Sequence, residues 1–123
     1  MKVSGIDAVY YTVNDVDVMS AFYAELLGAA PDMTWPGRLA EWTFGDGNSF
    51  GLYGGAEAEG MVGGSSGSVM FAVDDVAQAV SAAKGRGVTF QDNGDITDTP
   101  FCHMAFGEDP EGNQFILHHR KQA

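Results

Sequence analysis

The chain has 123 residues, of which 45% are hydrophobic, so we expect a buried core within one ordinary domain and not global disorder. Its formal net charge of -11 repels phosphate groups, which makes nucleic acids and anionic membranes poor partners. Cys102 is the single cysteine, so an internal disulfide is excluded, and no segment has the apolar length of a signal peptide or a membrane span. We therefore expect a cytoplasmic protein whose acidic surface serves mainly solubility.

The first predicted elements are a strand and a helix. Residues 9–13 alternate in polarity with period two, which is typical of a strand with two distinct faces. Asp15 and Asp17 follow as candidate N-caps, and apolar residues recur with helical spacing over 18–27 until Gly28. The pattern predicts a strand, a capped helix and a glycine stop.

Three further strands are predicted in the first half. Ala29–Trp35 is a weak candidate because prolines interrupt it. Residues 40–44 and 49–53 are better candidates, and the turn-forming sequence at 46–48 between them predicts a hairpin. A connector rich in glycine and small polar residues follows at 55–67.

The second half repeats this order about 60 residues later. Residues 69–73 predict a strand, Asp74 and Asp75 follow it as candidate N-caps, and residues 76–83 have helical periodicity that ends at glycines. Val88–Gln91 predicts a short strand. Two longer strands are predicted at 101–106 and 113–119, around turn-forming residues 108–112, in which Asp109 bonds the local backbone.

The repeat resembles the vicinal oxygen chelate superfamily, which includes glyoxalase I, bleomycin-resistance proteins and extradiol dioxygenases. The likeness rests on the strand-to-aspartate openings at 9–15 and 69–75, on AFYAELLGA at 21–29 and on DPEGN at 109–113. It implies an α+β fold in which two tandem βαβββ modules form an incomplete barrel around a ligand cavity. We expect one domain over 1–123, with module one at 1–54, a linker at 55–67 and module two at 68–123, and the resemblance also implies a homodimer.

Metal-using members of that superfamily place histidine, glutamine or carboxylate ligands on the first and last strands of each module. In this sequence the corresponding positions are Ala8, Ser68 and Ile116, and the strand 49–53 contains no carboxylate. Alanine and isoleucine have no ligand atom, and a serine hydroxyl alone is a weak ligand. We therefore predict no metal and no other cofactor at these positions.

Other chemistry in the sequence is less specific. A two-histidine site built from His103 and His118 across the last hairpin is a minor alternative, because His118 and His119 point to opposite faces of one strand. Cys102 and His103 also point to opposite faces, so they do not form a nucleophile–base pair, and a buried structural cysteine is the better interpretation. No catalytic residue is assigned.

A concave face with a few polar groups remains. The valine-rich faces of the two opening strands should pack under the helices, and the opposite faces should line a small-molecule pocket. Trp35 and Phe101 are further candidates for stacking surface. The predicted ligand-binding residues are Tyr10, Thr12, Trp42, Tyr53, Ser68, Met70, Ile116 and His118.

The sequence alone is compatible with three functions. The first is a metal-free protein that binds a small molecule, with sequestration of a drug or an aromatic metabolite, as in bleomycin-resistance members, as one form of this function. The second is a lyase, isomerase or dioxygenase with a metal in an atypical site, or an acid–base catalyst that uses His103, His118 or Tyr10. The third is an accessory protein that binds another protein through an exposed apolar patch.

Overall fold

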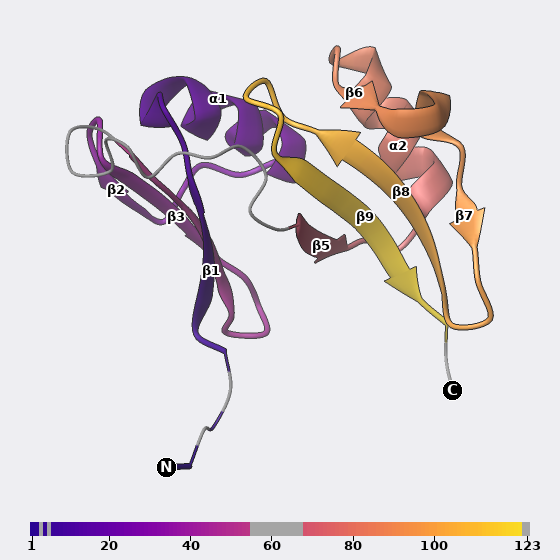
Figure 1. Cartoon of the computed structure of the whole chain (residues 1–123), viewed down its shortest axis with the longest axis horizontal. Coiled ribbons are helices and arrows are strands. Elements are labelled where there is room, and N and C mark those ends of the chain that lie inside the picture. Colours follow the sequence, from indigo (N-terminus) through magenta and orange to yellow (C-terminus); the bar gives the residue numbers. More distant parts are fainter. Residues whose placement is uncertain (3, 5, 55–67, 122–123) are drawn as a thin grey trace. The chain divides into compact units, whose positions relative to one another are not determined.

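The computed structural model describes residues 1–2, 4, 6–54 and 68–121, and it divides into two compact units (Figure 1). Unit one extends from residue 1 to 64 and unit two from 65 to 123. The predicted linker at 55–67 lies outside the described residues. Over the described residues, no helix has both the length and the apolar character needed to span a membrane.

Unit one consists of β1 (Ala8–Thr12), α1 (Val16–Leu27), β2 (Met33–Trp35), β3 (Leu39–Thr43) and β4 (Ser49–Tyr53). The sheet order is β1-β4-β3-β2, in which β1 pairs with β4 in parallel and the other pairs are antiparallel. This is the βαβββ arrangement expected from the repeat. The weak strand predicted over Ala29–Trp35 is shorter than expected, since only its last three residues, after Pro31, pair with β3.

Unit two consists of β5 (Ser68–Ala72), α2 (Val76–Gly85), β6 (Thr89–Phe90), a 3₁₀ turn η2 (Gln91–Gly94), β7 (Thr97–Asp98), β8 (Cys102–Glu108) and β9 (Gln114–Arg120). Its sheet order is β5-β9-β8-β6, with β5 parallel to β9. The module is therefore the same, with one addition: β7 pairs with β8 where the sequence indicated only a loop.

The predicted caps explain where both helices begin. Asp15 and Asp75 are extended N-cap residues, and each carboxylate accepts a hydrogen bond from the backbone N–H three residues later, at 3.0 Å. Gly28 ends α1 in the left-handed conformation, with φ of 73°. These local contacts hold the helices at the same place in the two modules.

Each helix covers one face of its own sheet. In unit one, Tyr23 of α1 packs against the rings of Tyr11, Trp42 and Phe50, which all lie on that face and are buried. In unit two, Phe71 and Phe115 lie on the face toward α2 and are buried. We call the opposite face of each sheet its open face.

Candidate functional site

Strand register decides which side chains share the open face of unit one. Tyr10 is paired with Gly51, and Gly51 is paired with Glu41, so these three residues form one row across β1, β4 and β3. Met33 continues the row on β2. Paired residues on neighbouring strands project from the same side of a sheet, so the row runs across the open face.

Tyr10 and Glu41 meet across the glycine. The Tyr10 hydroxyl donates a hydrogen bond to Oε1 of Glu41. A Cβ at position 51 would lie 2.5 Å from the Tyr10 ring, so the absence of a side chain at Gly51 provides the space through which the tyrosine reaches its partner. Gly51 therefore has a steric role that composition alone does not reveal.

Burial, followed by the hydrogen bond to Glu41 and the charge of Glu41, raises the pKa of Tyr10 to about 12. The phenol therefore remains protonated at neutral pH and keeps donating to Glu41. Its side chain is still 36% exposed, so its ring is accessible from solvent. The open face of unit one thus carries a fixed polar pair that a ligand can contact.

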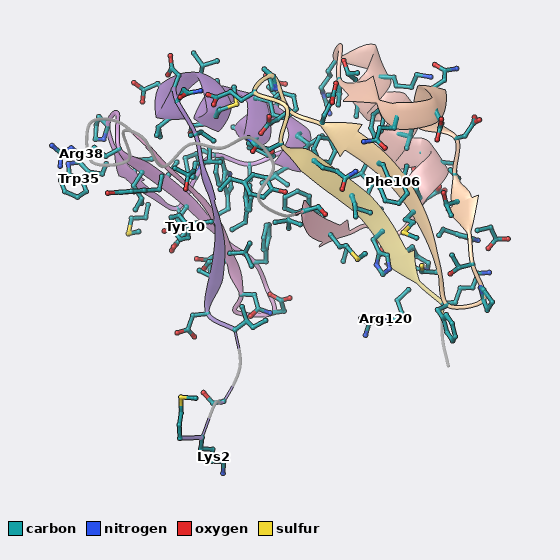
Figure 2. All side chains as sticks on the ribbon, in the orientation of Figure 1. Lys2, Tyr10, Trp35, Arg38, Phe106 and Arg120 are labelled. Carbon is teal, nitrogen blue, oxygen red and sulfur yellow. The ribbon has the colours of Figure 1, made fainter. Side chains whose placement is uncertain are left out.

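Exposed apolar side chains accompany this pair. Met33 and Trp35 of β2 are 49% and 54% exposed. Trp35 is paired with Leu39, which is paired with Tyr53, so the tryptophan lies in the row next to that of Tyr10. The Arg38 guanidinium lies 4.8 Å from the centroid of the Trp35 ring, and Figure 2 shows the two side chains together near the turn between β2 and β3.

The structure corrects the face predicted for Trp42. Its pairing partner is Phe50, it is 2% exposed, and its ring packs against Tyr23 of the helix. Its indole N–H donates to the backbone oxygen of Ala29 at 2.8 Å. Trp42 therefore belongs to the core under α1, because it is one residue out of phase with Glu41 on the same strand.

The other residues predicted in unit one lie on the open face. Tyr10, Thr12 and Tyr53 share that face, and Thr12 is the partner of Tyr53 in the register. Glu41, Gly51 and Met33 were not in the predicted set. Glu41 lies on the strand predicted at 40–44, but the pairing that brings it opposite Gly51 depends on the register, which the sequence did not specify.

The four residues predicted in unit two also share one face. Ser68, Met70, Ile116 and His118 project from the open face, where Met70 is paired with Ile116 and Ile116 with Phe106. Figure 2 labels Phe106 on this sheet. Met70 is 54% exposed and Ile116 is 5% exposed, so this row is apolar and partly covered.

The residues at the superfamily's ligand positions do not fit a metal ion. Ala8 and Ile116 have no ligand atom, Ser68 offers only a hydroxyl, and β4 contains no carboxylate. Over the residues that the structure describes, no group of three histidine, cysteine, aspartate or glutamate side chains is arranged to hold a metal ion.

The histidines are arranged differently from the predicted two-histidine alternative. His103 is paired with His119, whereas His118 is paired with Met104. His103 and His118 therefore lie on opposite faces of the sheet, and the site that would combine them is wrong. Cys102 and His103 also alternate between faces, as predicted, and Cys102 is buried.

The family model described as the glyoxalase/bleomycin resistance protein/dioxygenase superfamily matches residues 5–117. No curated protein matches the chain.

Solved structures share the fold over nearly the whole chain. The lactoylglutathione lyase of Agrobacterium tumefaciens is 19% identical, with a TM-score of 0.79 over 97% of this chain and 96% of that one. An integron cassette protein from the mobile metagenome of V. cholerae is 25% identical, with a TM-score of 0.75 over 97% of each chain. A glyoxalase/bleomycin resistance protein from Catenulispora acidiphila is 20% identical, with a TM-score of 0.71 over 94% of this chain and 98% of that one.

Proposed function

We propose that this chain, which belongs to the glyoxalase/bleomycin resistance protein/dioxygenase superfamily, binds a small aromatic molecule on the open face of unit one. We also propose that no metal ion binds at the superfamily's ligand positions, because Ala8 and Ile116 have no ligand atom and the Ser68 hydroxyl alone is a weak ligand. The observation that carries the proposal is the Tyr10–Glu41 hydrogen bond above Gly51.

The hydrogen-bonded pair of Tyr10 and Glu41 provides fixed polar atoms that can orient a bound ligand. The Tyr10 proton is committed to Glu41, so the phenol oxygen offers its lone pairs to a donor on the ligand. Small-molecule binding sites generally combine apolar and aromatic surface with a small number of fixed polar groups. Trp35 and Met33 supply exposed apolar surface on the same face of the sheet, and Tyr53 supplies a further ring.

Unit two has an open face of its own that also carries predicted binding residues. The row formed by Met70, Ile116 and Phe106 on its open face provides apolar contact area, and Ser68 and His118 lie on that face with polar groups. On unit one we include Tyr10, Thr12 and Tyr53 in the proposed binding set, whereas Ser68, Met70, Ile116 and His118 form a separate candidate surface on unit two. Trp42 is left out because it is buried under α1.

A thermal-shift screen of the protein against a library of aromatic molecules tests this function, since a ligand that binds only the folded state raises the unfolding temperature. Hits are then measured by calorimetry against the Glu41→Gln and Trp35→Ala variants. Each variant should weaken binding tenfold or more, because one removes the charge that holds Tyr10 and the other removes stacking surface.

Glu25→Gln is the matched control, since it removes an exposed carboxylate from α1 and leaves the open face intact. Its affinity for the hits should equal that of the unchanged protein. The proposal is wrong if Glu41→Gln and Trp35→Ala bind every hit as tightly as Glu25→Gln does, or if no member of the library stabilises the protein.

A further inference from the structure

Unit two contains a hollow that the proposed function does not use. It has a volume of about 610 Å³ and lies on the helix-covered side of the sheet, between the start of α2 and the strands β7, β8 and β9. The ionisable groups in its wall are Asp74, Asp75, Asp98, His103 and His119. None of these residues belongs to the open face of unit two, which lies on the other side of the same sheet.

The two histidines in this wall are direct cross-strand neighbours. His103 of β8 is paired with His119 of β9, so their Cβ atoms are separated by about 4.5–5.5 Å, the usual spacing for such a pair. Both side chains are half-buried and line the same hollow.

Each imidazole has one nitrogen held by an oxygen that can only accept. Nε2 of His103 lies 3.2 Å from the Asp98 carboxylate, and Nδ1 of His119 lies 3.0 Å from the backbone oxygen of Val73. In a neutral ring the proton therefore resides on the nitrogen that faces the oxygen, and the other nitrogen has a lone pair. No described residue hydrogen-bonds to that second nitrogen of either ring.

Asp98 is itself held in place. Nζ of Lys121 lies 2.6 Å from Oδ1 of Asp98 and 2.7 Å from the backbone oxygen of Thr99. The hydrogen bond and the charge of Lys121 keep the pKa of Asp98 below its usual range. A carboxylate or a carbonyl behind the ring is the support that metal-binding histidines generally have.

We propose that His103 and His119 bind a divalent transition-metal ion, with Asp98 and Val73 as the groups that orient the two rings. Imidazole nitrogen suits Zn²⁺, Ni²⁺ and Cu²⁺. The described residues include no set of three converging ligand side chains, so water completes the coordination, and the carboxylates of Asp74 and Asp75 add negative charge at the wall of the hollow. This site is on the opposite face of the sheet from the superfamily's ligand position at Ile116.

Titration of chelator-treated protein with Zn²⁺ alone, followed by calorimetry, tests the site. One Zn²⁺ should bind per chain, and His103→Gln and His119→Gln should each lower the affinity tenfold or more. Asp98→Asn should lower it about tenfold, as is typical when the group behind a ligating histidine is removed. His118→Gln is the matched control, because His118 is adjacent in sequence but lies on the other face, and it should leave the affinity unchanged.

The unchanged protein provides a second measurement that does not depend on the variants folding. In an NMR titration with Ni²⁺, the ring signals of His103 and His119 should broaden before that of His118. Absence of Zn²⁺ binding, loss of binding in His118→Gln, full binding in both His103→Gln and His119→Gln, or broadening centred on His118 would each overturn the proposal. These outcomes are independent of ligand binding around Tyr10, which lies in the other unit.

Discussion

The two units use one scaffold to present different chemistry at the same place. The row formed by Tyr10, Gly51 and Glu41 on the open face of unit one is equivalent to the row formed by Met70, Ile116 and Phe106 in unit two, because both rows cross the first strand, the last strand and its antiparallel neighbour in the same register. The first row contains a hydrogen-bonded pair and the second is apolar. The duplicated fold therefore fixes where side chains project without fixing what they do.

The helix-covered faces differ in a complementary way. Trp42 fills the space under α1, whereas the equivalent position in unit two is Gly107, over which the Phe115 ring lies. At the end of the last strand, Gly54 of unit one is equivalent to His119 of unit two. A Cβ at Gly54 would lie 2.4 Å from the Val13 backbone oxygen, whereas the ring of His119 bonds the equivalent oxygen of Val73.

The largest expected effect concerns the core of unit one. Trp42→Ala should lower the free energy of unfolding by about 3–5 kcal/mol, because it removes a buried ring that packs on Tyr23 and Phe50 and leaves a cavity. Trp35→Ala is the matched control. Because Trp35 is 54% exposed, this substitution should lower the free energy of unfolding much less. Urea denaturation followed by circular dichroism measures both, and equal losses would show that Trp42 does not carry the core of unit one.

A smaller effect compares the two glycines beneath aromatic rings. A Cβ at Gly107 would lie 2.5 Å from the ring of Phe115, which is fully buried and has no room to move. Gly107→Ala should therefore cost about 1–3 kcal/mol of stability, the usual range for overpacking. Gly51→Ala meets the Tyr10 ring at the same distance, but that ring is exposed and can swing away.

Gly51→Ala should therefore lower the free energy of unfolding by only about 0.5–1.5 kcal/mol, because it breaks the Tyr10–Glu41 hydrogen bond and nothing else. Denaturant unfolding of the two variants, measured side by side, gives the comparison. A loss in Gly51→Ala as large as that in Gly107→Ala would mean that the Tyr10 ring is as tightly held as that of Phe115, and the accessible polar pair would have to be reconsidered.

The sequence predicted the elements better than it predicted their partners. Local signals were sufficient for the helices, since Asp15, Asp75 and Gly28 act as caps as expected, and for the turn in which Asp109 accepts from the N–H groups of Glu111 and Asn113. The alternation of strands 9–13 and 69–73 also placed Tyr11 and Phe71 on the buried faces.

What local signals did not provide was register and phase. Trp42 was assigned to the wrong face because alternation alone does not say which parity faces the helix, and burial of an aromatic and exposure in a pocket leave the same pattern. The pairs Tyr10–Glu41 and His103–His119 join residues on different strands, so each depends on a register that only the assembled sheet sets. The short strand β7, which brings Asp98 to His103, has two residues and no periodicity to detect.

The smallest effect concerns the titration of Tyr10 and sharpens the contrast with the apolar row of unit two. The folded pKa of about 12 lies above the ordinary value of 10.0, so the folded protein retains this proton when the unfolded chain has lost it. The stabilisation is therefore complete below about pH 10 and is lost as the pH rises to about 12. Ultraviolet difference titration against Tyr10→Phe isolates this phenol from the other tyrosines.

In Glu41→Gln the pKa of Tyr10 should fall but stay above 10.0, because the hydrogen bond and charge of Glu41 are removed while burial, the largest cause, remains. Met70→Ala, which alters the equivalent row of unit two, should leave the titration unchanged. If the pKa of Tyr10 in Glu41→Gln equalled that of the unchanged protein, Glu41 would not be the acceptor of the phenol proton. The polar character that distinguishes the open face of unit one would then need another source.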